Sequence, residues 1–170
     1  MMFTRHPHLL PLLLLLAVAA LLRIASIGSQ WSQLERDPDA YRRIAENLVQ
    51  RGTYSTSPDL DDPHPSTTAF RPPLYPLSLA LVSWQGVVRP VGVATLHVVL
   101  GVITVLLSYW LARAWRLERY SYLAALLVAA DPILLNQSSQ VMTETLATML
   151  AVMALLALTK CSKPPSAKMR

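Results

Sequence analysis

The sequence predicts an all-α membrane protein with about four membrane-spanning helices and one large polar loop between the first two. Three observations support this fold class. The 170 residues are 53% hydrophobic and only 15% charged, whereas soluble domains carry about 25% charged residues. The apolar residues form long blocks, close to the length at which a helix crosses a ~30 Å hydrocarbon core. Most carboxylates lie in the polar stretch from Arg36 to Pro76.

The first apolar segment, Leu9 to Ile27, is predicted to be an uncleaved membrane helix. The rival interpretation is a secretory signal peptide with a weak cleavage site at Ala25-Ser26-Ile27-Gly28. Arg23 favours the helix, because a charge interrupts the segment where the apolar region of a signal peptide should end cleanly. The Arg23 side chain is expected to snorkel toward the membrane surface.

The loop from 28 to 89 is predicted to carry an amphipathic surface helix from Asp39 to Gln50. Asp37 or Asp39 is expected to cap this helix, and Gly52 is expected to end it. Its apolar face comprises Tyr41, Ile44, Ala45, Leu48 and Val49, and its polar face comprises Arg42, Arg43, Glu46 and Asn47.

The second half of the loop is rich in proline and acid. Ser55 to Thr68 is predicted to be a solvated acidic loop, and its His64 has no clear second metal ligand nearby. The prolines at 72, 73 and 76 are predicted to exclude helix until about Leu77. A short apolar segment follows, to Trp84.

The predicted topology places both polar loops on one side of the membrane. The expected spans are 9–27, 90–112, 119–135 and 141–159. Basic residues at both chain ends and between Arg113 and Arg119 mark a cytoplasmic side by the positive-inside rule. The loop 28–89 and the short loop 136–143 then face the extracytoplasmic side of the cell (inner) membrane. The net charge of +5 therefore indicates topology, with no nucleic-acid partner.

Three residues stand out as candidates for chemistry. Asp37 and Glu144 are acids beside apolar spans, which are costly unless paired or functional. Asp37 suits a general base toward a hydroxyl or amine, and helix capping is its structural alternative. Arg71, held between Phe70 and a double proline, is a stiffly presented cation suited to a phosphate or carboxylate. Anchoring to lipid headgroups is its structural alternative.

Other chemistry finds less support. Cys161 is the only cysteine, which excludes an intrachain disulfide and a cysteine-based zinc site. No clustered metal-ligand set is visible from spacing, and a divalent-metal requirement stays open. A transporter is disfavoured because no ionisable residue lies mid-span, apart from Asp131 beside Pro132.

Four motifs occur in a defined order. They are Asp37-Pro38-Asp39-Ala40-Tyr41, Gly52-Thr53-Tyr54-Ser55, Phe70-Arg71-Pro72-Pro73-Leu74-Tyr75-Pro76 and Thr143-Glu144-Thr145. Their order and spacing resemble the N-terminal part of the GT-C polytopic membrane glycosyltransferases. This group includes protein mannosyltransferases, aminoarabinose transferases and lipopolysaccharide-core galacturonosyltransferases. The resemblance extends from about Leu9 to Leu158.

The resemblance implies an activity and site residues. Such enzymes move a sugar from a polyprenyl-phosphate carrier to a lipid, glycan or protein acceptor on the extracytoplasmic face. Asp37 matches the catalytic acid of the first loop. Asp39 is the second choice, because this chain has Asp-Pro-Asp in place of the usual adjacent acidic pair. The resemblance also implies that Arg71 lies near the carrier phosphate, and that Glu144 and Tyr41 belong to the substrate or carrier site.

The chain is shorter than the proteins it resembles, which commonly have more than ten spans. It is therefore expected to be a truncated product or one part of a split enzyme, inactive alone. Its expected partners are membrane lipid, the lipid-linked donor, the acceptor and a missing C-terminal part. The alternative is a small non-enzymatic membrane protein, or assembly partner, with the same scaffold.

Overall fold

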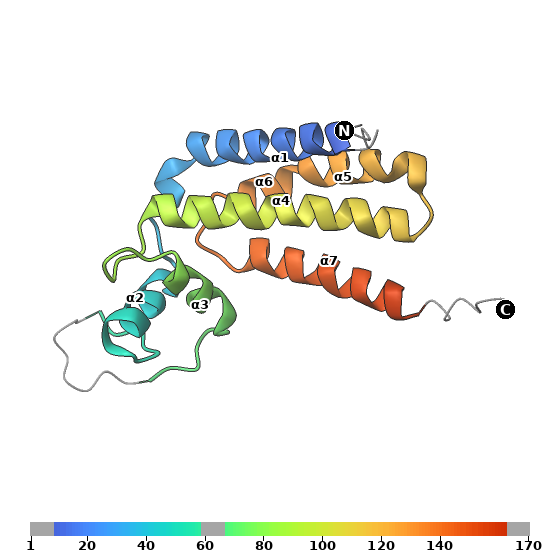
Figure 1. Ribbon diagram of the computed structural model, residues 1–170. Coiled ribbons are helices and arrows are strands. Elements are labelled where there is room, and N and C mark those ends of the chain that lie inside the picture. The colour runs from blue at the N-terminus through green and yellow to red at the C-terminus, as the bar shows by residue number, and fades with distance from the viewer. Residues whose placement is uncertain (1–8, 59–66, 163–170) are drawn as a thin grey trace, which may run out of the picture.

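The chain folds into a bundle of helices that lie side by side, with a smaller helical lobe at one end of the bundle (Figure 1). The arrangement is that of a computed structural model, which describes residues 9–58 and 67–162. Within these residues all the secondary-structure elements are helices, and none is a strand, which confirms the all-α prediction. Among them, three helices are long and apolar enough to cross a membrane: α1 (Leu9–Ser29), α4 (Pro90–Ala114) and α7 (Glu144–Cys161).

Helix α4 is the centre of the bundle and contacts α1, α5 and α7. Pro90 occupies its first turn, where a missing N–H costs no hydrogen bond. Helices α1 and α7 keep many large apolar side chains exposed, as a lipid-facing helix does. The bundle therefore supports an integral membrane protein.

The segment predicted as the third span is divided into two helices. These are α5 (Ser121–Ala129) and α6 (Pro132–Gln137), preceded by the short helix η2 (Glu118–Tyr120). Asp131 begins α6, because its Oδ1 accepts hydrogen bonds from the N–H groups of Ile133 at 2.9 Å and Leu134 at 3.0 Å. At 1.5 Å per residue, neither α5 nor α6 alone reaches membrane length.

The lobe contains η1 (Trp31–Gln33), α2 (Tyr41–Arg51) and α3 (Leu74–Leu81). Gly52 ends α2 with φ +68°, and its N–H donates to the Leu48 carbonyl at 3.0 Å, as predicted. Helix α3 contains Pro76, so the prediction that proline excludes helix before Leu77 is wrong. The N–H groups of a first helical turn have no partner within the helix, so proline is tolerated there.

The two predicted faces of α2 need correction at Asn47 and Val49. Asn47 is buried, and its Nδ2 donates to the carbonyls of Ser55 at 2.8 Å and Ser57 at 3.1 Å. Val49, expected on the apolar face, is exposed. Asn47 therefore packs against the chain that follows the helix, and its amide satisfies the carbonyl groups of Ser55 and Ser57.

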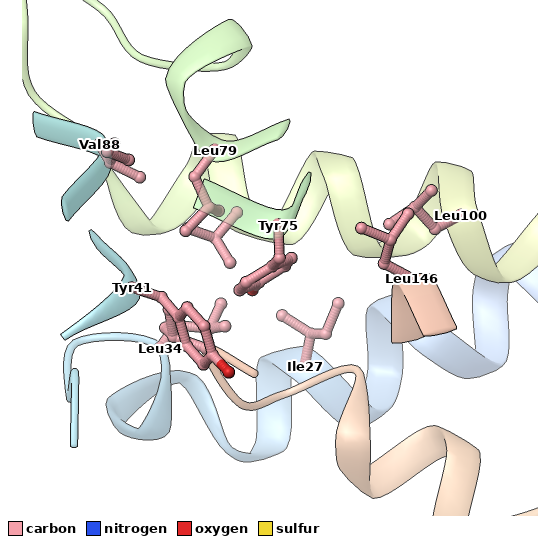
Figure 2. Close-up of a cluster of buried hydrophobic side chains, with 11 residues drawn as sticks. Ile27, Leu34, Tyr41, Tyr75, Leu79, Val88, Leu100 and Leu146 are labelled. Carbon is pink, nitrogen blue, oxygen red and sulfur yellow. The ribbon is translucent and has the colours of Figure 1, made fainter. Parts of the chain in front are cut away.

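One cluster of buried apolar side chains joins the lobe to the bundle (Figure 2). Tyr41, Tyr75 and Leu79 enter it from the lobe. Its other members are Ile27, Leu34, Ala45, Val88, Val93, Leu100, Val141 and Leu146. A second cluster, around Leu15, Val105 and Ala125, lies toward the opposite end of α1 and α4. The lobe is thus held by the same apolar core that holds the helices.

Several sequence predictions fall on residues that are not described. They concern the acidic run of Asp59, Asp61 and Asp62, the histidine His64, the basic residues among 1–8, and the tail 163–170.

Candidate functional site at the lobe end of the bundle

Two polar segments that are far apart in the sequence meet in a hollow of about 440 Å³. Gln33, Arg36, Asp37 and Pro38 line it from the first loop, and Gln140, Val141 and Met142 line it from the second. This hollow, called the junction hollow below, is lined by a segment that follows α1 and a segment that precedes α7. The prediction that the two loops lie at the same end of the helices is confirmed.

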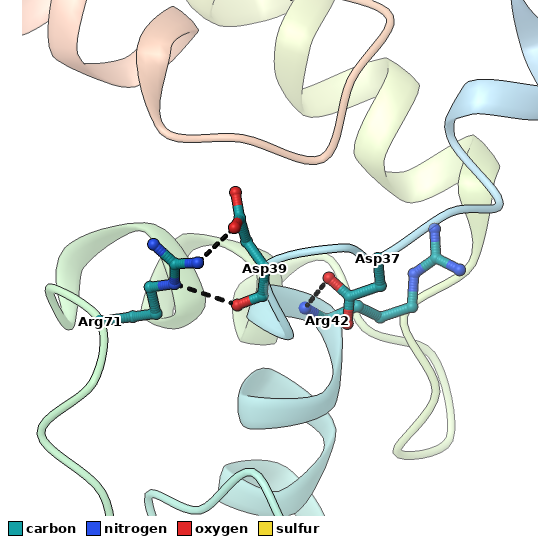
Figure 3. Close-up of polar contacts among 4 residues, drawn as sticks. All are labelled: Asp37, Asp39, Arg42 and Arg71. Carbon is teal, nitrogen blue, oxygen red and sulfur yellow. Dashed lines mark hydrogen bonds and ion pairs between the residues drawn. The ribbon is translucent and has the colours of Figure 1, made fainter.

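Asp37 lines the junction hollow and also caps α2 (Figure 3). Its Oδ1 accepts from the N–H of Arg42 at 3.2 Å, and its Oδ2 accepts from the N–H of Arg43 at 3.1 Å. These donors are otherwise unpaired at a helix start. The Arg42 guanidinium in turn donates to the carbonyls of Leu34 and Glu35, which fixes the chain leading to Asp37. Each Asp37 oxygen retains a further lone pair for a ligand.

Asp39 is paired with Arg71, 32 residues further along the chain (Figure 3). The Arg71 Nη2 bonds the Asp39 carboxylate, and Nε donates to the Asp39 carbonyl at 3.2 Å. The Arg71 guanidinium carbon lies 5.2 Å from the centroid of the Tyr41 ring and 4.2 Å from that of Phe70. Arg71 is therefore held between an acid and two aromatic faces, which orients its remaining donors.

The Gly52-Thr53-Tyr54-Ser55 motif anchors Arg71 from its other side. The Tyr54 hydroxyl donates to the Arg71 carbonyl at 2.8 Å, and the Tyr54 carbonyl accepts from the Thr68 N–H at 2.9 Å. Burial, with a smaller contribution from Tyr41, raises the pKa of Tyr54 above its usual value, so the hydroxyl keeps its proton. Two of the sequence motifs thus serve one purpose, which is to fix the position of Arg71.

Glu144 is the first residue of α7. Its Oε2 is buried and has no hydrogen-bond partner among the described residues. Burial raises the pKa of Tyr75 above its usual range, and the charges of Asp37 and Glu144 raise it further. Both acids are thus near enough to Tyr75 to act on it. A buried carboxylate oxygen without a partner needs a ligand or water to satisfy it.

Tyr41 and His97 are buried, and both contact Tyr75. Tyr41 is buried, and its ring meets that of Tyr75 edge to face with centroids 5.1 Å apart. The Tyr75 hydroxyl lies 2.8 Å from Nε2 of His97, which is wholly buried in α4. Sequence reasoning missed His97. The available signal was a lone polar ring in an otherwise apolar span.

Arg23 does not snorkel as predicted. It is 1% exposed, and its Nη1 donates to the Ala19 carbonyl at 3.4 Å. Its Nε has no partner among the described residues, and the side chain borders a cavity of about 10 Å³, close to the smallest volume that holds one water. Thr104, Ser138, Thr145 and Thr148 also line that cavity. The guanidinium passes over Gly101 of α4, where any side chain would collide with it.

Within residues 9–58 and 67–162, no three His, Cys, Asp or Glu side chains lie close enough to hold one ion.

Membrane-length helices and an acid-bearing hollow at one end of them define an integral membrane protein with a polar site near the membrane boundary. The chain belongs to the dolichyl-phosphate-mannose-protein mannosyltransferase family, whose model matches residues 72–170, more than half of the chain. The expected resemblance to GT-C glycosyltransferases is thereby confirmed. No curated protein and no solved structure matches the chain.

The family match covers only part of the candidate site. It begins at Pro72, so Glu144 and His97 lie within it, whereas Asp37, Asp39, Tyr41 and Arg71 lie outside. Membership indicates glycosyl transfer from a lipid-linked donor as the reaction of the family.

Proposed function

We propose that the lobe end of this chain is the acid-bearing half of a glycosyltransferase site. It takes a sugar from a polyprenyl-phosphate carrier and transfers it to an acceptor on the extracytoplasmic face of the cell membrane. The observation that supports this most is the junction hollow. There Asp37 meets the segment leading to Glu144, in a member of a lipid-linked mannosyltransferase family.

Asp37 is the proposed catalytic base. It lines the junction hollow, and its carboxylate is held in place by two backbone N–H groups. A base positioned in this way can accept the proton of an acceptor hydroxyl or amine as the sugar is transferred. Asp39 remains the second choice, because its carboxylate is already engaged by Arg71.

Arg71 is the proposed ligand of the carrier phosphate. Its guanidinium has five N–H donors, and its contacts with Asp39 involve Nε and one terminal nitrogen. The planar fork that remains matches a phosphate oxygen pair. In this assignment the Tyr41 ring packs against the Arg71 guanidinium. Glu144 contributes its unpaired oxygen to the substrate site.

The test of the base compares two carboxylates of one segment. Membranes containing the full gene product are supplied with radiolabelled dolichyl-phosphate mannose. Asp37→Asn is expected to lower sugar transfer by about 100-fold or more, the usual contribution of a general base. The asparagine keeps one oxygen for the α2 cap, so insertion and folding should persist. Glu35→Gln, an exposed neighbour, is the control and should retain activity. Near-normal transfer by Asp37→Asn would overturn the assignment.

The proposed orientation places the lobe outside and Cys161 inside. A membrane-impermeant maleimide applied to intact cells should label Ala69→Cys in a Cys161→Ser background, since position 69 is exposed. The native Cys161, exposed at the opposite end, should be labelled only after the membrane is opened. The reverse pattern would contradict the orientation.

The alternative of a non-enzymatic small membrane protein has less support. It gives no reason for an acid-lined hollow or for an unpaired Glu144 oxygen. It would gain support if Asp37→Asn, Arg71→Gln and the parent chain behaved alike with the labelled donor.

A further inference from the structure

His97 is the only histidine among the described residues, and both of its ring nitrogens are engaged. Nε2 lies 2.8 Å from the Tyr75 hydroxyl, and Nδ1 lies 2.8 Å from the Ser138 carbonyl oxygen. The residue is wholly buried in α4, and Tyr75 and Ser138 are buried as well. A buried polar group that has both partners specifies one arrangement of the chains that carry them.

The partners define the direction of both hydrogen bonds. A carbonyl oxygen can only accept, so Nδ1 carries the ring proton and donates to Ser138. Nε2 then accepts, and the Tyr75 hydroxyl donates to it. Burial keeps the pKa of Tyr75 above its usual range, which leaves that donor protonated at neutral pH. His97 therefore accepts one hydrogen bond, from Tyr75, and donates one, to Ser138, through opposite sides of its ring.

The Tyr75 side leads to Arg71. The rings of Tyr75 and Tyr41 meet edge to face at 5.1 Å, and the Arg71 guanidinium lies 5.2 Å from the Tyr41 centroid. Rotation of the Tyr75 ring would shift the Tyr41 ring, and with it the surface on which Arg71 rests. Figure 2 shows the Tyr41 and Tyr75 side chains together in the cluster that joins lobe and bundle.

The Ser138 side leads to the second-loop segment that lines the junction hollow. Ser138 follows α6 directly, and the next residues, Gln140 to Met142, line the hollow before α7 begins. The Ser26 hydroxyl ties the same segment to α1 by donating to the Leu135 carbonyl at 3.0 Å. His97 thus contacts one chain that supports Arg71 and one chain that supports Glu144.

We infer that His97 is a positioning residue, which sets the separation between the lobe segment that carries Arg71 and the segment that leads from Ser138 to Glu144. The inference rests on the proposed function for the roles of Arg71 and Glu144. His97 itself touches no substrate in this arrangement.

The test uses variants that remove or restore one contact at a time. His97→Phe keeps a ring and loses both hydrogen bonds. His97→Asn places an amide where Nδ1 lies, and His97→Gln places one where Nε2 lies, so each restores one partner. Tyr75→Phe removes only the hydroxyl. Ser108→Ala, which removes a different buried hydroxyl from α4, is the matched control.

The first readout does not depend on activity. The full chain in nanodiscs is treated with phenylglyoxal, and modification of Arg71 is measured by mass spectrometry relative to exposed Arg116 in the same sample. His97→Phe and Tyr75→Phe should both raise the Arg71-to-Arg116 ratio several-fold, whereas Ser108→Ala should leave it unchanged. His97→Gln should restore the ratio more fully than His97→Asn, because it restores the Tyr75 side. An unchanged ratio in both His97→Phe and Tyr75→Phe would overturn the inference.

The second readout separates this inference from the proposed function. With labelled dolichyl-phosphate mannose, His97→Phe should raise KM by about tenfold or more through misplacement of Arg71. A changed Arg71 ratio with no donor-dependent transfer in any variant would support the positioning role and count against the proposed function. Transfer with an unchanged KM in His97→Phe would do the reverse.

Discussion

The two ends of the bundle treat charge in opposite ways. At the lobe end, Asp37 is held by two backbone N–H groups, and Asp39 and Arg71 are paired with each other. At the opposite end, Arg116 and Arg119 lie exposed on the turn between α4 and α5. The comparison shows two uses of charge in one small protein. At the lobe end the charges are fixed by partners, as the proposed site requires, whereas exposed basic residues such as those at the opposite end are the kind that the positive-inside rule counts.

The largest expected effect lies between the two ends, where Arg23 crosses Gly101. A Cβ at position 101 would lie 1.8 Å from the Arg23 Nε, so Gly101→Ala must displace a buried guanidinium. Overpacking of this kind costs about 1–3 kcal/mol. Thermal unfolding in detergent should show the loss. Gly28→Ala, with nothing within 4 Å of its new Cβ, is the control and should show none.

A double variant checks the cause of that loss. Arg23→Ala removes the colliding side chain, so adding Gly101→Ala to it should cost little more. Additive losses in the double variant would contradict the proposed collision.

A smaller effect is expected from the cap at the lobe end. Asp37→Ala leaves the Arg42 and Arg43 N–H groups without acceptors and should destabilise α2 by about 0.5–2 kcal/mol. Hydrogen exchange at those two amides should accelerate, with little change in α7. Glu118→Ala, an exposed acid at the opposite end, serves for comparison. Equal protection of both amides in the parent and Asp37→Ala would contradict the capping role.

The smallest effects compare single arginines of the two ends. Arg71→Gln loses a partly exposed ion pair, which contributes about 1 kcal/mol or less. Arg116→Gln alters an exposed side chain and should stay within about 0.5 kcal/mol of the parent. Chemical unfolding in detergent can rank the two. The contrast between the ends would fail if Arg116→Gln were the more damaging.

The long helices could be predicted from the sequence because apolar length alone specifies them. The break at Asp131 was missed, although an acid followed by proline is a known helix start and stood inside the predicted span. The predicted start of helix near Leu77 is too late, because Pro76 lies in the first turn of α3 and not in its interior. At Asp131 the apolar pattern hid a helix start, and at Pro76 the first-turn exception to the proline rule applies.

The candidate site was predictable only in part. The meeting of the two loops followed from counting spans, and the cap by Asp37 followed from its position before α2. The partners of His97 and Arg23 are distant in the sequence, so the local pattern does not identify them, whereas Asn47 bonds the chain just after its own helix. The role of a polar residue in apolar surroundings depends on its tertiary contacts, and hydrophobic periodicity does not predict those contacts.

The exposed apolar flanks of α1 and α7 also bear on how a substrate reaches the site. Both helices leave large aliphatic side chains uncovered along their length, and the lobe begins where α1 ends. Helix α4, with 25 residues, is about 37 Å long, slightly more than the hydrocarbon thickness of a bilayer. The lobe therefore lies next to one end of the membrane-length helices. Under the proposed function, a lipid-linked donor would reach it by lateral diffusion within its leaflet.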